Sequence, residues 1–167
     1  MPGGDSLPDV FWSGGLAFDC SRCSACCRHE PGLVLLSAAD LRLLLDHLGL
    51  DFKGFFAKYC RLVPLGGGTA VCLKETREYD CIFWKNGCTV YESRPVQCRT
   101  YPFWPGVVDS REDWNREAGR CPGMGRGPVH PRAEIEEALW AYRRNSPILL
   151  DPGADPESLD EHTILGS

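Results

Sequence analysis

Four cysteines within eight residues form the part of the sequence most able to do chemistry. Cys20, Cys23, Cys26 and Cys27 make a C-x2-C-x2-C-C run. Cysteines two residues apart can surround one metal, because the intervening backbone can direct its N–H groups at the sulfurs. Cysteines also serve as small buried apolar residues, but packing hardly explains four in eight positions. The run therefore predicts a metal site. We expect the adjacent side chains of Cys26 and Cys27 to diverge, so that one of them serves a second metal or a bridging role.

Two further cysteines, Cys81 and Cys88, flank Asn86-Gly87, a dipeptide that predicts a hairpin turn. A two-residue turn there places Lys85 opposite Cys88 and separates Cys81 from Cys88 by ~13 Å, at ~3.3 Å per residue. This distance excludes a disulfide and a shared mononuclear site, unless Cys81 precedes the regular strand. The other four cysteines are widely spaced: Cys60, Cys72, Cys98 and Cys121.

The cysteine spacing bears on the kind of metal. Structural zinc sites usually combine two C-x2–4-C pairs at a distance, and this chain has one such cluster. Three close cysteines with a remote cysteine before proline are typical of ferredoxins, and Cys121-Pro122 supplies the remote pair. The spacing slightly favours a 4Fe–4S cluster over zinc, although thiolates suit both metals.

Other polar residues near the cysteines are candidate members of the site. Arg94 and Arg99 flank Cys98, and positive charge beside a cysteine favours the thiolate. We expect them to offset the charge of a thiolate centre, with surface ion pairs as the alternative. His29 is close enough to Cys27 in sequence to bind metal, but an exposed loop histidine is the commoner case. No catalytic triad, P-loop or Rossmann motif is present.

Composition limits the classes of function. The 167 residues and the 43% hydrophobic content are as expected for one globular domain, whereas ten cysteines are well above average usage. Residues 1–17 lack the basic segment and apolar run of a secretion signal, so we expect a cytoplasmic protein, in which disulfides do not persist. No apolar run is long enough for a membrane span. The net charge of −5 comes from the acidic last 17 residues, and the balanced remainder predicts no nucleic-acid binding.

The elements that must position these residues follow from caps and periodicity. The pattern predicts an α+β domain with several short helices, a β-hairpin and extensive irregular loops around the metal centre. We expect one helix after Ser37, with Asp40 in an acidic capping box and Gly49 at its end. A second helix is expected from Asp51 to Arg61, stopped by Pro64 and the glycines 66–68. Two more are expected from Ser93 to Arg99 and from Pro131 to Asn145. Expected strands are 69–74, 80–85 and 89–91. Residues 1–17 are expected to form a flexible arm, 18–147 the metal-binding domain, and 148–167 a disordered acidic tail.

Three ordered motifs, `FDCSRCSACCRHEPG`, `DCIFWKNGCTVYESRPVQCRTYPFW` and `CPG`, resemble the CxxCxxCC family of zinc- or iron-chelating domains over residues 18–127. The resemblance implies eight metal ligands: Cys20, Cys23, Cys26, Cys27, Cys81, Cys88, Cys98 and Cys121. Tyr91, Arg94, Pro95, Arg99, Pro102 and Phe103 match the family's Y-x-x-R-P-x-x-C-R-x-x-P-F element. The family commonly has glycine where this chain has Ser24, and Cys60 and Cys72 fall outside its pattern.

We therefore predict a protein that binds zinc or an iron–sulfur cluster through thiolates, in one or two centres. An iron–sulfur enzyme is the first alternative, because a related cysteine domain occurs in the flagellin lysine N-methylase, which is associated with an iron–sulfur cluster. We expect no catalytic residues, and a protein that is not an enzyme on its own. An exported disulfide protein is the second alternative.

Overall fold

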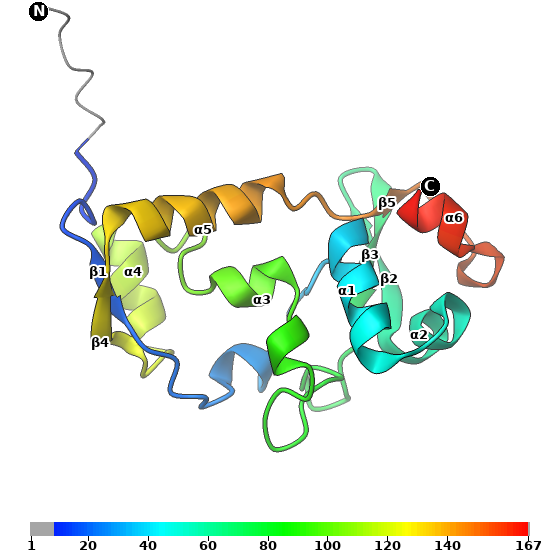
Figure 1. Ribbon diagram of the computed structural model, residues 1–167, viewed down its shortest axis with the longest axis horizontal. Helices are drawn as coiled ribbons and strands as arrows, with labels where there is room; N and C mark the ends of the chain where they lie inside the picture. Colours follow the sequence, from blue (N-terminus) through cyan, green and yellow to red (C-terminus); the bar gives the residue numbers. More distant parts are fainter. Residues whose placement is uncertain (1–8, 167) are drawn as a thin grey trace, which may run out of the picture. The chain divides into compact units, whose positions relative to one another are not determined.

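The computed structural model describes residues 9–166, which form two compact units. Unit 1 contains the described residues up to Cys23 together with Pro102–Trp140, and unit 2 contains Ser24–Tyr101 and the chain from Ala141 onwards. Residues 9–166 hold six α-helices and two small antiparallel sheets, which confirms the α+β class (Figure 1). None of the described helices is long and apolar enough to cross a lipid bilayer.

Unit 2 begins its regular structure with two capped helices. Helix α1 (Ala38–Leu48) starts with a capping box between Ser37 and Asp40 and ends at Gly49, whose φ is 61°. These bounds confirm the sequence prediction. Helix α2 (Phe52–Tyr59) is capped by Asp51. It ends two residues before the predicted Arg61, because strand β2 begins at Cys60.

The sheet of unit 2 has the strand order β2-β3-β5. Strands β2 (Cys60–Leu65) and β3 (Gly68–Leu73) pair in a hairpin, and β5 (Leu149–Leu150) joins the outer edge of β3. Gly66 and Gly67 both have positive φ, at 57° and 82°, as a two-residue hairpin turn requires. The hairpin therefore lies earlier in the chain than predicted. Strand 69–74 is confirmed within one residue at each end, but residues 80–85 and 89–91 form no regular strands.

The C-terminal segment completes the core of unit 2. Helix α6 (Glu161–Leu165) follows the short helix η3 (Pro156–Ser158), and its N-terminus is capped by Asp160. Leu159, Ile164 and Leu165 are buried against α1 and α2 residues of the same cluster. The prediction of a disordered tail is therefore wrong for residues 149–165, because burial of apolar side chains orders this segment despite its acidic composition.

Unit 1 is built on strands β1 (Leu16–Phe18) and β4 (Met124–His130), with helix α4 (Arg111–Ala118) and the first nine residues of helix α5 (Arg132–Arg144). The last helix was predicted within one residue at each end. Trp12 and Leu16 are buried, so a flexible arm is wrong for residues 9–17. Residues 1–8, the rest of the predicted arm, lie outside the described residues.

Candidate metal site

Five of the eight predicted ligands belong to unit 2, on three segments of chain. Cys26 and Cys27 lie on the short helix η1 (Ala25–Cys27), and Cys81 and Cys88 lie on the irregular loop after β3. Cys98 lies on helix α3 (Val96–Thr100), which follows the short helix η2 (Tyr91–Ser93). All ten cysteines of the chain fall within the described residues, and none forms a disulfide there.

The first two segments are joined directly at their cysteines. The backbone N–H of Cys81 donates to the carbonyl oxygen of Cys27 at 2.8 Å. The next residue, Arg28, forms an ion pair with Asp80 at 3.0 Å. The guanidinium of Arg28 also lies 3.6 Å from the ring centroid of Trp84. One backbone bond and two side-chain contacts thus hold the chain at Cys27 against the chain at Cys81.

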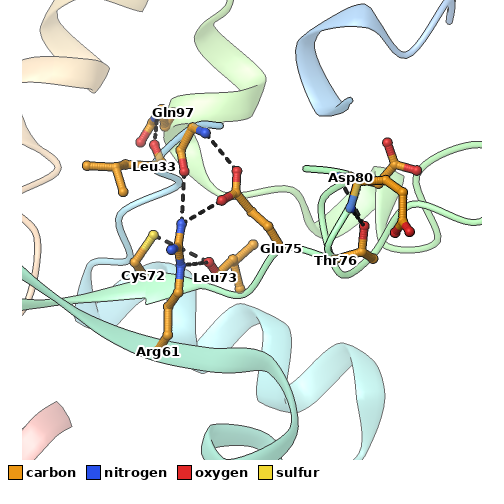
Figure 2. A network of polar contacts seen from close by, with 10 residues as sticks. Leu33, Arg61, Cys72, Leu73, Glu75, Thr76, Asp80 and Gln97 are labelled. Atoms are coloured by element: carbon orange, nitrogen blue, oxygen red, sulfur yellow. Dashed lines mark hydrogen bonds and ion pairs between the residues drawn. The ribbon is translucent and has the colours of Figure 1, made fainter. Parts of the chain in front are cut away.

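A second network fixes the chain that leaves the cysteine run. The N–H of Gly32 donates to Glu75 at 2.7 Å, and Arg61 donates to the carbonyl of Gly32 at 3.1 Å and to Glu75 at 2.8 Å. Figure 2 shows Arg61 and Glu75 beside each other, with their polar ends directed at the segment that carries Leu33. This network connects the cysteine run to the sheet of unit 2, because Arg61 lies on β2.

Helix α3, which carries Cys98, is held by side chains rather than by its own length of five residues. The buried carboxylate of Asp40 accepts from the N–H of Val96 at 2.8 Å and from the amide of Asn145 at 2.7 Å. Gln97 accepts from the N–H of Leu35 at 3.2 Å and donates to the carbonyl of Leu33 at 2.7 Å. Cys98 therefore takes its position from α1 and from the segment after the cysteine run.

The sulfurs of Cys26 and Cys27 lie 3.7 Å apart. The expectation that these side chains diverge is wrong, because the tight turn of η1 brings them to the same side. Two thiolates on one tetrahedral zinc, each with a Zn–S bond of ~2.3 Å, stand about 3.8 Å apart. The pair thus has the separation of two ligands of a single ion.

The thiols of the cluster interact electrostatically with one another. The pKa of Cys27 is raised well above its ordinary value by its hydrogen bond with Cys26, by burial, and by the charges of Cys26, Cys81 and Cys98. Burial raises the pKa of Cys98, and the charges of Cys81, Cys26 and Cys88 raise it further. Burial raises the pKa of Cys81 to about 11. Several thiolates at these positions would repel one another, and a bound cation removes that penalty.

The two arginines that were predicted to offset the thiolate charge differ in their surroundings. The charge of Arg94 lowers the pKa of Cys88 and of Cys98, opposing the larger effect of burial. Arg94 is fixed by a hydrogen bond to the carbonyl of Tyr91 at 2.9 Å and stacks on the Tyr91 ring. Arg99 is exposed and does not contribute to these shifts. His29 is also exposed and has a φ of 75°.

A small pocket of about 50 Å³ adjoins the cluster, and its lining residues include Cys26, Cys27, Cys81, Glu30 and Glu75. It has room for an ion beside three sulfurs. Within residues 9–166, no three Cys, His, Asp or Glu side chains are close enough together to hold a metal as they stand. Coordination therefore requires the thiol side chains to rotate toward a common point.

Unit 1 contains the other three predicted ligands, Cys20, Cys23 and Cys121. Cys20 and Cys23 are exposed, and Cys121 is buried. The N–H of Asp19 donates to the carbonyl of Gly123 at 3.1 Å, so the chain at Cys20 runs beside the chain at Cys121. A Cβ at position 123 would clash with the carbonyl oxygen of Asp19. Glycine is therefore needed for this close approach.

A family model described as "CxxCxxCC: Putative zinc- or iron-chelating domain" matches residues 19–122. The chain belongs to this family. The CxxCxxCC match covers every predicted ligand, and its description supports chelation of zinc or iron without distinguishing the two metals. No solved structure matches the chain significantly.

Ser24, within the CxxCxxCC motif, has an unusual backbone conformation. Ser24 has φ 66° and ψ 8°, in the left-handed region, which glycine adopts without strain. Glycine, which the resemblance implies at this position, would adopt the same conformation. Ser24 begins η1, and its carbonyl accepts from the N–H of Cys27 at 2.9 Å, so the unusual φ directs the chain into the turn that presents the vicinal cysteines.

Cys60 and Cys72, which lie outside the CxxCxxCC pattern, are buried residues of the sheet in unit 2. Cys60 pairs with Leu73, and Cys72 pairs with Arg61. Directly opposed residues share a face and neighbours along a strand alternate, so Cys60 and Cys72 point to opposite faces. Burial, with a smaller effect from Cys72, raises the pKa of Cys60 to about 12.

Sequence reasoning missed the residues that assemble the cluster. Asp40 was recognised as part of a capping box, but its bonds to Val96 and Asn145 span 56 and 105 positions. Arg28 and Asp80 each adjoin a predicted ligand and have opposite charge. That combination is the one local signal that could have identified them as a pair.

Proposed function

We propose that this protein binds a metal ion through cysteine thiolates of unit 2, and that zinc or iron held by single-ion coordination is its resident metal. The candidate ligands are Cys26, Cys27, Cys81, Cys88 and Cys98, of which four complete a tetrahedral site. The observation that carries the proposal is the 3.7 Å separation of the Cys26 and Cys27 sulfurs, which suits one tetrahedral ion.

The polar network supports the same proposal. A metal site gathers ligands from several loops only when those loops are held in place. The bond from Cys81 to Cys27, the Arg28–Asp80 ion pair and the bond from Val96 to Asp40 fix the three cysteine segments. The small pocket lined by three cysteines supplies space for the ion.

An iron–sulfur cluster, with 4Fe–4S the favoured type, is the second candidate. It is favoured by Cys121-Pro122 and by the number of predicted ligands, which exceeds the four that one ion needs. On this proposal Cys20, Cys23 and Cys121 of unit 1 are ligands as well. The role of the centre, whether structural, electron transfer or metal handling, is part of the same question.

The test is anaerobic purification followed by analysis for zinc, iron and acid-labile sulfide. A colourless protein with stoichiometric zinc, or with iron and no sulfide, supports the single-ion site. A brown protein that absorbs near 400 nm and contains sulfide equimolar with iron supports the cluster. A protein with neither metal, which also fails to bind added Zn²⁺ or Fe²⁺ after reduction, would overturn both proposals.

A further inference from the structure

One buried polar atom of the cluster region has no hydrogen-bond partner. The indole Nε1 of Trp84 is shielded from solvent and forms no hydrogen bond with any of the described residues. The indole N–H is a donor only. A buried donor without an acceptor costs roughly 1–3 kcal/mol, so native structures nearly always supply a partner.

The backbone places the Trp84 side chain beside two candidate ligands. The N–H of Trp84 donates to the carbonyl of Cys81 at 2.7 Å. Trp84 also forms an antiparallel bridge with Cys88, in place of the predicted pairing between Lys85 and Cys88. Residues directly opposite in such a bridge have Cβ atoms about 5 Å apart on the same face. The indole and the Cys88 thiol therefore leave the backbone on the same side.

The indole is also held in one orientation by charge. Arg28 stacks on its face at 3.6 Å and is tied to Asp80, so the ring is enclosed by neighbours of Cys27 and Cys81. A cation over the ring is attracted to its π face and withdraws electron density, which makes the N–H a stronger donor. Such a donor gains most from a charged acceptor, which a cysteine thiolate can supply.

We infer that the Trp84 indole N–H donates a hydrogen bond to a metal-bound cysteine sulfur, and that the bridge with Trp84 favours Cys88 as the acceptor. This inference rests on the proposed function. A neutral thiol sulfur is a weak acceptor, whereas a metal-bound thiolate carries the charge that makes a strong hydrogen bond. Trp84 is therefore a positioning residue, which orients one ligand and stabilises its thiolate form.

The test uses the full chain labelled with ¹⁵N and titrated with ¹¹³Cd²⁺, a thiolate-binding substitute for zinc with a nuclear spin. Trp84→Phe identifies the Trp84 indole signal by its loss. We expect that signal to move downfield on metal binding and to show scalar coupling to ¹¹³Cd through the N–H···S–Cd path. The exposed Trp140, which lies in unit 1, is the control, and its indole signal should show no coupling.

Affinity gives the second measurement. Trp84→Phe retains an aromatic ring for Arg28 but removes the donor, and we expect it to weaken Cd²⁺ binding about tenfold, the lower end of what loss of an outer partner of a ligand costs. Trp140→Phe should leave affinity unchanged. If ¹¹³Cd shows a thiolate-bound resonance but the Trp84 signal neither moves nor couples, the inference is wrong and the proposed function survives. If no thiolate-bound ¹¹³Cd resonance appears, both fall together.

Discussion

Unit 2 contains two groups of cysteines that differ in backbone rather than in residue type. Cys60 and Cys72 lie on regular strands, buried on opposite faces of the β2–β3 hairpin. The five cysteines of the candidate site lie on short helices and an irregular loop, where the sulfurs of Cys26 and Cys27 lie 3.7 Å apart. Strand alternation separates neighbouring sulfurs, whereas turns and interlocked loops bring sulfurs together. A cysteine count therefore says little about metal binding until the backbone that carries each cysteine is known.

The largest expected effect comes from replacing one cysteine of each group and comparing the losses of zinc affinity and of stability. Cys81→Ser should lower zinc affinity on the order of 100-fold or more, a larger loss than removing an outer partner causes. Cys72→Ala should leave zinc stoichiometry unchanged and reduce the free energy of unfolding by about 1–2 kcal/mol, because it removes buried volume. Competition with a chromogenic chelator measures the first effect, and urea unfolding of the metal-free protein measures the second. Loss of zinc from the Cys72 variant would contradict the division into two groups.

The second expected effect is a pH dependence of metal affinity. The raised pKa values of Cys27 and Cys98 keep both groups as neutral thiols near pH 7, so that binding must release their protons. The apparent association constant should therefore rise with pH, by about tenfold per pH unit for each thiol deprotonated. Chelator competition between pH 6 and 8 gives the slope. Cys60→Ala should have the wild-type slope, and a flat profile for the wild type would exclude these thiols as ligands.

The third prediction concerns Cys60 and the alkaline stability of the sheet. Its pKa is raised in the folded state from 9.0 to about 12, so above pH 9 the unfolded chain loses a proton that the folded protein retains. Stability is intact below pH 9 and should fall as the pH rises toward 12, by about 1.4 kcal/mol per pH unit from this group. Denaturant unfolding of the metal-free protein should show a shallower fall for Cys60→Ala. An unchanged profile in that variant would show that Cys60 ionises freely in the folded state.

The smallest expected effect concerns backbone strain in the cysteine loop. Ser24→Gly should stabilise the protein by about 1 kcal/mol, because it removes the cost of a left-handed conformation for a residue with a Cβ. Ser13→Gly, at an exposed position without a positive φ, is the matched control and should not stabilise. Thermal unfolding compares the two variants. Equal changes in stability for the two variants would show that Ser24 is not strained in the folded loop.

The parts of the fold that were predictable depend on local chemistry. Ser37, Asp40 and Gly49 lie within one helix and its caps, and they defined α1 correctly. Gly66-Gly67 was interpreted as a helix stop, although two adjacent glycines also suit a hairpin turn, and this choice lengthened α2 and moved the hairpin. Asn86 and Gly87 both have positive φ, 57° and 134°, but the bridge between Trp84 and Cys88 replaces the predicted two-residue turn. The chain before it is held by Arg28 and Cys27 and does not continue as a strand.

The sequence predicts which cysteines are candidate ligands, but not how the chain arranges them. The CxxCxxCC motifs identify the cysteines, because ligands are read from type and spacing. The positions of the unit 2 cysteine segments depend on Asp40 and Arg28, whose partners lie 56 and 52 positions away in the chain. Contacts over such separations come from the packed fold, and a single sequence gives no measure of them.

The close approach at Gly123 sets a limit on how unit 1 can change. The Asp19 carbonyl occupies the space that any side chain at position 123 would fill, and Cys20 follows Asp19 directly. Mutation at a position that is neither charged nor able to bind metal would thus displace a predicted ligand. In a mutational scan, Gly123 should tolerate replacement about as poorly as the cysteines themselves. At Gly66 and Gly67 an added Cβ would face open space, so replacement there should cost only the strain of a positive φ.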